Sequence, residues 1–212
     1  MGLENLFDEG ARARIAEAVK SAEARSEGQI VPVVVERSDS FSEARYRGAL
    51  AGVLLATGVV LLFWGWVHPW ELALVQVGAW LMGWGVSAWD PIERRLVGRK
   101  VLAEAARARA VRAFHEHNLH RTAAGTGVLI FASLFEHEVV VLGDRGIDAQ
   151  MGPEGWKHAV DALVRALRAS RPAEGFVEAI AQCGEVLARH FPRAGGTGPN
   201  ELDDRLRMDK SL

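Results

Sequence analysis

Two long apolar runs, separated by a short break, constrain this chain more than any other feature of its sequence. The first run, Gly48–Trp66, has about 19 uncharged residues, and a helix of that length spans about 28 Å, close to the hydrocarbon core of a bilayer. The second run, Leu72–Trp89, has about 18 residues and is also uncharged. Pro69 lies in the break, where it blocks helix continuation and favours a tight turn. The pattern predicts a transmembrane helical hairpin over residues 48–89.

The composition of the two runs fits a lipid environment. A chain of 212 residues is too short to bury two helices that are apolar on all sides. Amphipathic indoles favour the headgroup zone, and tryptophans lie near the ends of the runs, at Trp64, Trp66, Trp70 and Trp89. Glycines let two membrane helices approach closely, and the runs contain Gly48, Gly52, Gly58, Gly78, Gly83 and Gly85.

The flanking charges predict the orientation of this hairpin. Arg45 and Arg47 precede it, four cationic residues lie within residues 94–100, and the break contains neither Lys nor Arg. Short loops rich in Lys and Arg stay in the cytoplasm. We therefore expect an integral protein of the inner or plasma membrane, in contact with the lipid bilayer and with both termini in the cytoplasm.

The overall composition excludes several classes of function. The net charge of −2 gives no basic face for nucleic acid, so we expect no nucleic-acid partner. The single cysteine, Cys183, excludes an intrachain disulfide and a Cys-rich zinc site.

The residues outside the hairpin predict one small α/β sandwich. Apolar periodicity predicts helices over residues 9–26 and 90–117, and two more that begin at Pro153 and Pro172. The arginines of the 90–117 helix are typical of a solvated face, with anionic lipid as the alternative contact.

Three β-branched runs predict strands over residues 29–36, 128–133 and 138–142. Pro32 is expected near the start of the first strand or on a bulge. The first two strands are joined by a long helical excursion and should be parallel, whereas the short link between the second and third makes an antiparallel hairpin. The predicted sheet is therefore mixed.

The organisation follows from these elements. We expect residues 1–47 to supply the N-terminal helix and first strand, 48–89 the transmembrane hairpin, 90–192 the remainder of the domain, and 193–212 a polar, mobile tail. The hairpin thus interrupts the α/β domain.

Several segments together resemble the TPM domain family, in particular a bacterial, membrane-anchored subgroup with a hairpin after the first strand. They are Gly28–Val35, Gly127–Ile130, Val139–Ile147, His190–Pro192 and Asn200–Leu202. The resemblance implies an α/β/α fold. It also implies two kinds of activity, because some members are reported as acid phosphatases that resemble metal-binding proteins and others look like assembly factors for membrane complexes.

Two aspartates are the strongest candidates for chemistry. Asp144 and Asp148 flank the glycine turn after the third strand, where carboxylates can hold Ca²⁺ or Mg²⁺, and Asp144 is the candidate catalytic residue. The alternative is that Asp144 caps a turn. Nearby, Glu136, His137 and Glu138 form a cluster that is more typical of a solvated turn than of a site.

Two other patterns favour structural explanations. His115, His117 and His120 lack the spacing of a zinc protease and suit the end of a helix. Cys183 and Arg189 have the spacing of a thiol phosphatase, but the residues between them are helical in pattern rather than a phosphate-binding loop.

Together these observations predict that the chain is a membrane-anchored, TPM-like domain that acts as a binding or assembly module for membrane-associated partners. The alternative is a metal-dependent acid phosphatase that hydrolyses phosphomonoesters. A third possibility is a structural subunit that joins a larger membrane complex through its hairpin.

Overall fold

The computed structural model describes residues 3–64, 68–122, 125–151, 153–193 and 202–209. The chain forms two compact units. The domain unit consists of Met1–Ser38 and Glu104–Leu212, and the hairpin unit of Asp39–Ala103.

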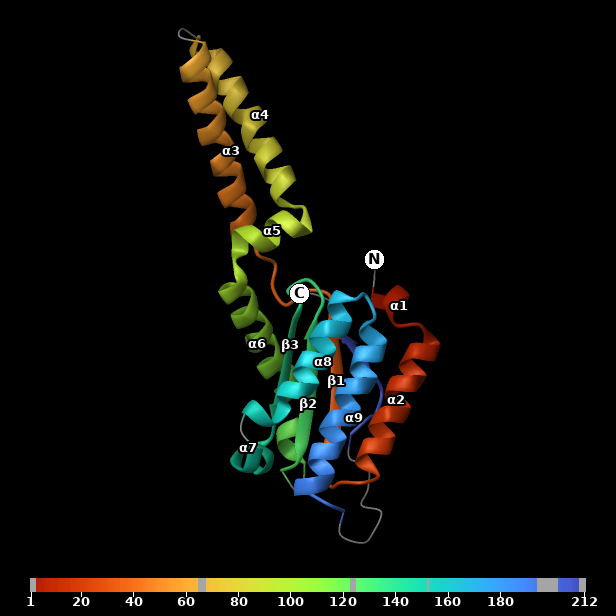
Figure 1. Cartoon of the computed structure of the whole chain (residues 1–212). Helices are drawn as coiled ribbons and strands as arrows, with labels where there is room; N and C mark the ends of the chain where they lie inside the picture. The colour runs from red at the N-terminus through yellow and green to blue at the C-terminus, as the bar shows by residue number, and fades with distance from the viewer. Residues whose placement is uncertain (1–2, 65–67, 123–124, 152, 194–201, 210–212) are drawn as a thin grey trace. The chain divides into compact units, whose positions relative to one another are not determined.

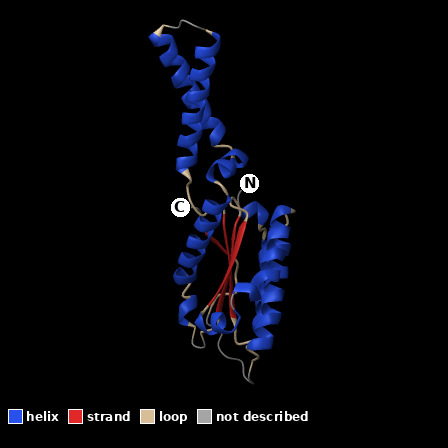
Figure 2. Cartoon of the chain, turned by 60° about the vertical axis from the view of Figure 1, so that its left-hand side comes forward, coloured by secondary structure: helices blue, strands red, loops and turns tan. Residues whose placement is uncertain are grey.

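The domain unit is built on a mixed four-stranded sheet in the order β3-β2-β1-β4 (Figure 1). β1 (Gln29–Val35) pairs in parallel with β2 (Gly127–Ser133), and β2 pairs antiparallel with β3 (Glu138–Gly143), as the sequence predicted. β1 and β2 are buried along almost their whole length, because helices cover both faces of the sheet (Figure 2).

Two predictions about this sheet are wrong. Pro32 lies in the middle of β1 opposite Ile130, not at its start or on a bulge. The strand accommodates a residue without an N–H because its other neighbour, β4 (Arg207–Asp209), pairs only with Val33–Val35. The existence of β4 also corrects the expectation of a mobile tail, since the chain returns to the sheet there; residues 194–201, including the predicted Asn200–Glu201 motif, lie outside the described part.

One face of the sheet packs on α1 (Leu3–Leu6), α2 (Glu9–Glu23), α8 (Lys157–Arg168) and α9 (Pro172–His190). Ile30 and Val34 of β1 point into this core, where Phe7 and Phe176 meet edge to face with ring centroids 5.9 Å apart. The opposite face, with Val31, Val33 and Val35, packs on the alanine-rich side of α6 (Arg99–Glu116) and on the short 3₁₀ helix η1 (Leu119–Arg121). The alternation follows from the two-residue period of a strand.

Three local predictions differ from the structure. The expected helix over residues 90–117 is divided into α5 (Asp90–Val97) and α6, because Gly98 has a left-handed φ of 85°. The expected glycine turn after β3 becomes α7 (Arg145–Met151). The helix expected from Pro153 starts as the 3₁₀ helix η2 (Pro153–Trp156) before α8.

The hairpin unit contains two long helices, α3 (Ser42–Phe63) and α4 (Pro69–Ser87), which lie side by side and antiparallel (Figure 1). Among the described residues, α3 is the one helix that by itself is long and apolar enough to cross a membrane, so this criterion does not support the second crossing of the predicted transmembrane hairpin. α4 meets the same criteria only together with α5, and a bend of 94° separates those two helices. Residues 65–67, including Trp66, lie outside the described part of the turn.

Candidate functional site

The helices of the hairpin touch through their backbones at three glycines. A Cβ on Gly52 would lie 2.7 Å from the carbonyl oxygen of Ala79, and one on Gly83 would lie 2.6 Å from that of Gly48. Gly48 itself faces Ser87. These contacts confirm the predicted close approach at Gly48, Gly52 and Gly83. The remaining three glycines, Gly58, Gly78 and Gly85, meet nothing within 4 Å, so the prediction is wrong for them.

A polar pair lies between the same helices, farther from their charged end. Gln76 Nε2 donates to Thr57 Oγ1 at 3.2 Å, and that hydroxyl donates to the carbonyl oxygen of Val53 at 2.8 Å. The two side chains therefore satisfy each other's hydrogen-bonding groups inside the hairpin, as a lipid environment would require.

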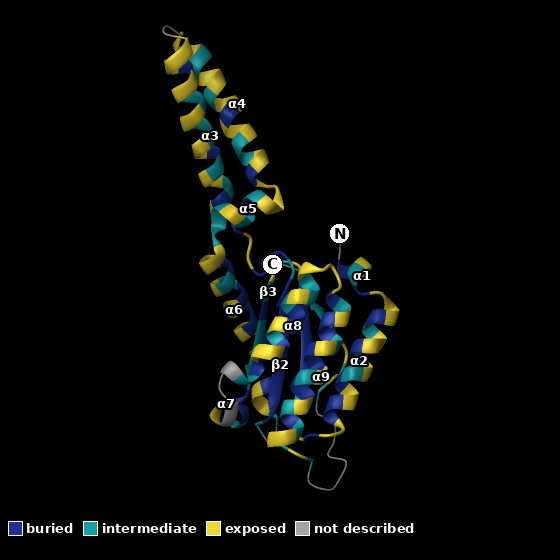
Figure 3. Ribbon diagram, in the orientation of Figure 1, coloured by how far each residue is buried: buried dark blue, intermediate teal, exposed yellow. Residues whose placement is uncertain are grey.

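The outer surface of the hairpin is apolar and exposed (Figure 3). Leu55, Leu62 and Phe63 are 73%, 76% and 75% exposed. The other large apolar side chains exposed on the two helices include Leu50, Leu54, Leu61, Leu74, Val77, Leu81 and Met82. Soluble monomers rarely expose contiguous apolar patches of more than a few hundred Å², so this surface is suited to lipid or to a protein partner.

Asp144 follows β3 and lies at the amino end of the parallel strands, because β3 runs antiparallel to β2. Its Oδ1 accepts the N–H of Arg145 at 2.7 Å, its N–H donates to the carbonyl oxygen of Gly127 at 2.8 Å, and it is 9% exposed. These bonds place Asp144 in the turn that leads into α7, which agrees with the structural alternative. Asp148 belongs to α7, but its side chain lies outside the described part.

A metal site at these two aspartates would need further ligands. No group of three or more His, Cys, Asp or Glu side chains that could hold a metal ion occurs among the described residues. Ca²⁺ takes six to eight oxygen ligands, and one of the two predicted ligands, Asp148, has a side chain outside the described part. The Ca²⁺ or Mg²⁺ site at Asp144 and Asp148 therefore stays a prediction.

A buried acid lies at the opposite, carboxyl end of the parallel strands, where ligands bind in many α/β folds. Glu136, in the turn between β2 and β3, is 4% exposed, so the expectation of a solvated turn is wrong for this residue. Its Oε1 accepts the N–H of Ser38 at 2.8 Å, and its other oxygen accepts the hydroxyl of Ser133. The Ser38 hydroxyl donates to Ser133 Oγ at 2.9 Å.

These contacts join the end of β1 to the turn that follows β2. Burial raises the pKa of Glu136, and the hydrogen bonds from Ser133 and Ser38 oppose that rise. Arg37 lies beside the network, with its guanidinium carbon 3.6 Å from the centre of the Phe135 ring. Ser38 and Ser133 are fully buried as well, so the cluster presents no accessible nucleophile. We call the hydrogen-bonded group of Ser38, Ser133 and Glu136 the clasp, because it holds the end of β1 against the turn after β2.

A second buried acid was not identified from the sequence. Glu23, the last residue of α2, accepts the N–H of Ile30 at 2.8 Å and forms a side-chain hydrogen bond with Asp204 in the segment before β4. Burial raises the pKa of Glu23 from 4.5 to about 7; the Ile30 N–H lowers it and the Asp204 carboxylate raises it. The sequence did contain a signal, because Glu23 continues the four-residue spacing of the buried Ile15 and Val19.

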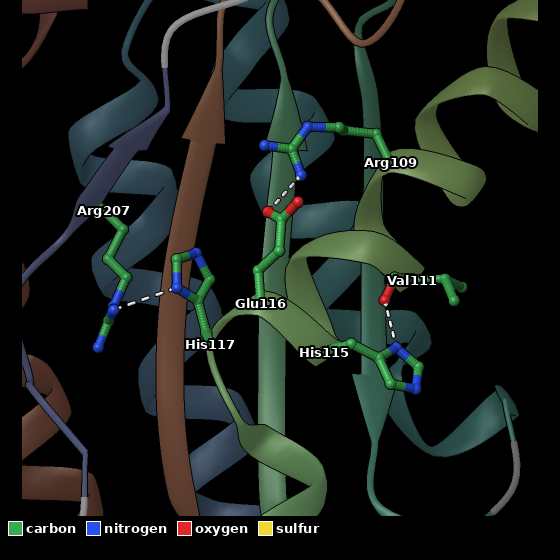
Figure 4. A network of polar contacts seen from close by, with 6 residues as sticks. All are labelled: Arg109, Val111, His115, Glu116, His117 and Arg207. Atoms are coloured by element: carbon green, nitrogen blue, oxygen red, sulfur yellow. Dashed lines mark hydrogen bonds and ion pairs between the residues drawn. The ribbon is translucent and has the colours of Figure 1, made fainter.

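The histidines at the end of α6 have separate partners (Figure 4). His115 Nδ1 is 2.8 Å from the carbonyl oxygen of Val111, and His117 Nδ1 is 3.1 Å from Arg207 of β4. Arg109 and Glu116 form an ion pair of 3.0 Å beside them. His120 lies in η1, with its ring 5.2 Å from that of His115. The arrangement joins α6 to β4 and supports the structural explanation over zinc binding.

The Cys183 and Arg189 spacing has no chemical role in this fold. Both residues lie in α9, and Cys183 is completely buried in the core. Burial raises the pKa of its thiol to about 12, whereas a phosphatase nucleophile needs a stable thiolate.

Comparison with known proteins finds one family likeness. Residues 96–186 match the model of the TPM domain. This part of the chain is similar to a TPM domain. The match covers α6, β2, β3, α7, α8 and most of α9, and it excludes the hairpin helices, β1 and the N-terminal helices. The TPM domain family includes proteins described as phosphatases.

A solved structure shares the fold of this chain. The NMR structure of BA42 protein from the psychrophilic bacterium Bizionia argentinensis has a TM-score of 0.61, 17% sequence identity, and coverage of 98% of this chain and 99% of its own. At that identity the likeness concerns the fold alone. No curated protein matches this chain.

Proposed function

We propose that this chain is an integral membrane protein whose TPM domain serves as a binding or assembly module for membrane-associated partners. The observation that carries the proposal is the exposed apolar surface of α3 and α4. In water this surface would favour aggregation, whereas in a bilayer it is covered by acyl chains.

The packing of the hairpin supports two membrane crossings. α3 has 22 residues and α4 has 19, which correspond to about 33 Å and about 28 Å of helix. The two helices are in contact at Gly48 and Ser87, at Gly52 and Ala79, and at Thr57 and Gln76. Because these contacts are distributed along both helices, a membrane that holds α3 would hold α4 as well.

The charge distribution supports cytoplasmic termini. Arg45 and Arg47 lie in the first turns of α3 and the cluster at residues 94–100 follows α4, whereas the described residues at the other end carry only Glu71 as a charged group. A fluorescent-protein fusion at either terminus should therefore fluoresce in the cytoplasm. A secreted-phosphatase fusion that is active on the outside would refute this orientation.

Membrane integration is tested by alkaline carbonate extraction of cell membranes. We expect the full chain to resist carbonate and to be released by mild detergent. A Leu54→Lys/Leu55→Lys variant should become extractable, because both residues are exposed on α3 and two lysines near its centre oppose insertion. The matched variant Arg107→Lys/Arg112→Lys, on exposed positions of α6, should behave as the parent. Release of the parent by carbonate would overturn the anchor.

The role as a module is tested by native electrophoresis of digitonin-solubilised membranes. A chain that serves in assembly should migrate in a complex larger than the purified protein in the same detergent. Migration as the isolated chain at native expression levels would contradict the proposal. The phosphatase alternative, with Asp144 and Asp148, rests on the likeness to the TPM domain family, and an assay of phosphomonoester hydrolysis tests it.

A further inference from the structure

The helix that follows the hairpin leaves it at a right angle. α5 is bent by 94° from α4, and the break falls at Ala88 and Trp89. If α4 crosses the bilayer, a premise that rests on the function proposed above, α5 lies close to the plane of the membrane surface. Trp89, exposed at the bend, is a residue type that prefers the headgroup zone.

An ion pair fixes α5 against the hairpin. Glu93 of α5 is completely buried, and its Oε1 lies 3.4 Å from Nε of Arg45 in α3. α5 packs on both α3 and α4. The contact therefore withdraws the carboxylate of Glu93 from the surface and holds the helix across the base of the hairpin.

The outward side of α5 and of the turn after it is cationic. Ile92, Leu96 and Val97 are partly buried, whereas Arg95 and Arg99 are exposed. Counted over residues 43–47 and 90–100, six Lys and Arg side chains accompany three acidic ones, of which Glu93 is buried. A partly buried apolar side and a basic exposed side are the features of a helix that lies at an interface.

An aromatic cluster lies at the same end of the hairpin. The Tyr46 and Trp84 rings meet edge to face with centroids 4.7 Å apart, and Trp80 stacks on Trp84 at 5.4 Å. Tyrosine and tryptophan gather where acyl chains meet headgroups. This cluster therefore puts the base of the hairpin, and α5 with it, at the depth of lipid phosphates.

We propose that α5 and the turn at Gly98 form a binding surface for the headgroups of anionic phospholipids. Guanidinium groups match phosphate geometry through paired N–H donors, and Arg95 and Arg99 supply two of them. The surface selects anionic over zwitterionic lipid because its exposed charge is positive. The TPM domain is thereby joined to the membrane by a charge-selective contact in addition to its apolar anchor.

The experiment measures which lipid surrounds α5 in the full chain. An Ala88→Cys variant places a thiol at an exposed position beside the bend. An environment-sensitive fluorophore will label it alone, because the native Cys183 is buried and its thiol pKa is raised to about 12. The labelled protein is reconstituted in phosphatidylcholine vesicles that contain spin-labelled phosphatidylglycerol or spin-labelled phosphatidylcholine, which quench the fluorophore at close range.

We expect phosphatidylglycerol to quench several-fold more efficiently than phosphatidylcholine at equal density. One cationic side chain near an anionic surface is worth about fivefold in relative affinity. The double variant Arg95→Gln/Arg99→Gln should therefore remove the several-fold preference and bring the ratio of the two quenching efficiencies to about one, because two such side chains are together worth up to about 25-fold. The matched variant Arg107→Gln/Arg112→Gln, on exposed positions of α6, should retain it.

The outcomes separate this inference from the anchor. Equal quenching by the two lipids would overturn the headgroup surface and leave the membrane anchor intact. No quenching by either lipid would overturn both. An equal loss of preference in the two double variants would overturn the assignment to α5, because it would show a general effect of net charge.

Discussion

The buried acid Glu23 gives the sharpest quantitative prediction. The folded chain holds this carboxyl with a pKa of about 7, whereas an unfolded chain returns it to 4.5. Between these values the folded state binds more protons than the unfolded state, so its free energy of unfolding falls as the pH rises. Linkage gives a loss of about 2.5 kcal/mol between about pH 5 and about pH 8.

The perturbation is Glu23→Gln. A glutamine amide is neutral at every pH, can accept the N–H of Ile30 as Glu23 does at 2.8 Å, and can donate to the Asp204 carboxylate in place of the shared proton. The variant should therefore keep the contacts of the protonated acid and lose its titration. Relative to the parent, it should gain about 2.5 kcal/mol of stability on going from about pH 5 to about pH 8.

The assay uses the only cysteine of the chain. Cys183 is buried in the same core as α2, so a dipyridyl disulfide reaches its thiol only when the domain unit opens. The parent and the variant share the same thiol and the same Glu136, so the pH dependence of both groups drops out when the two labelling rates at one pH are divided. That ratio should change by about 70-fold over the pH interval, and a ratio that stays constant would refute the reasoning. Asp204→Asn should flatten the parent's pH dependence in part, because that carboxylate raises the pKa of Glu23.

Three further predictions test the hairpin, the clasp and the phosphatase alternative. Gly52→Leu should destabilise the hairpin by about 2 kcal/mol in detergent, because its Cβ would meet the Ala79 carbonyl oxygen. The thermal midpoint followed by tryptophan fluorescence should therefore fall for Gly52→Leu and stay unchanged for the control variant Gly58→Leu. Equal midpoints for the two variants would contradict the packing. Glu136→Ala should lower the free energy of unfolding by about 3 kcal/mol, because the buried Ser38 N–H loses its acceptor. Hydrogen exchange of the Ser38 amide should become faster, and an unchanged exchange rate would show that the clasp is dispensable. Phosphomonoester hydrolysis by the detergent-purified chain, with and without Mg²⁺ or Ca²⁺ and beside Asp144→Ala, decides the enzymatic alternative: we expect no turnover above the variant, and metal-dependent turnover lost in the variant would establish a phosphatase.

The sequence by itself determined the elements whose residues carry their own periodicity. The β-branched runs of β1, β2 and β3 specified buried strands, and the lengths of their connections specified which pair is parallel and which is antiparallel. The hairpin helices were specified in the same way, because an uncharged run broken by Pro69 has few alternatives. These features are local, so one chain is enough to reveal them.

The tertiary structure decided what depends on contacts between distant segments. Arg207–Asp209 is too short to signal a strand and pairs only because β1 presents an open edge. Gly98 could have continued a helix, but its left-handed φ ends α5 and separates it from α6. Glu136 follows β2 in a turn that reads as solvated, and it is buried because Ser38 arrives from 98 residues away to hydrogen-bond it. Burial and pKa depend on the neighbours that folding supplies, and the sequence order of a single chain does not contain them.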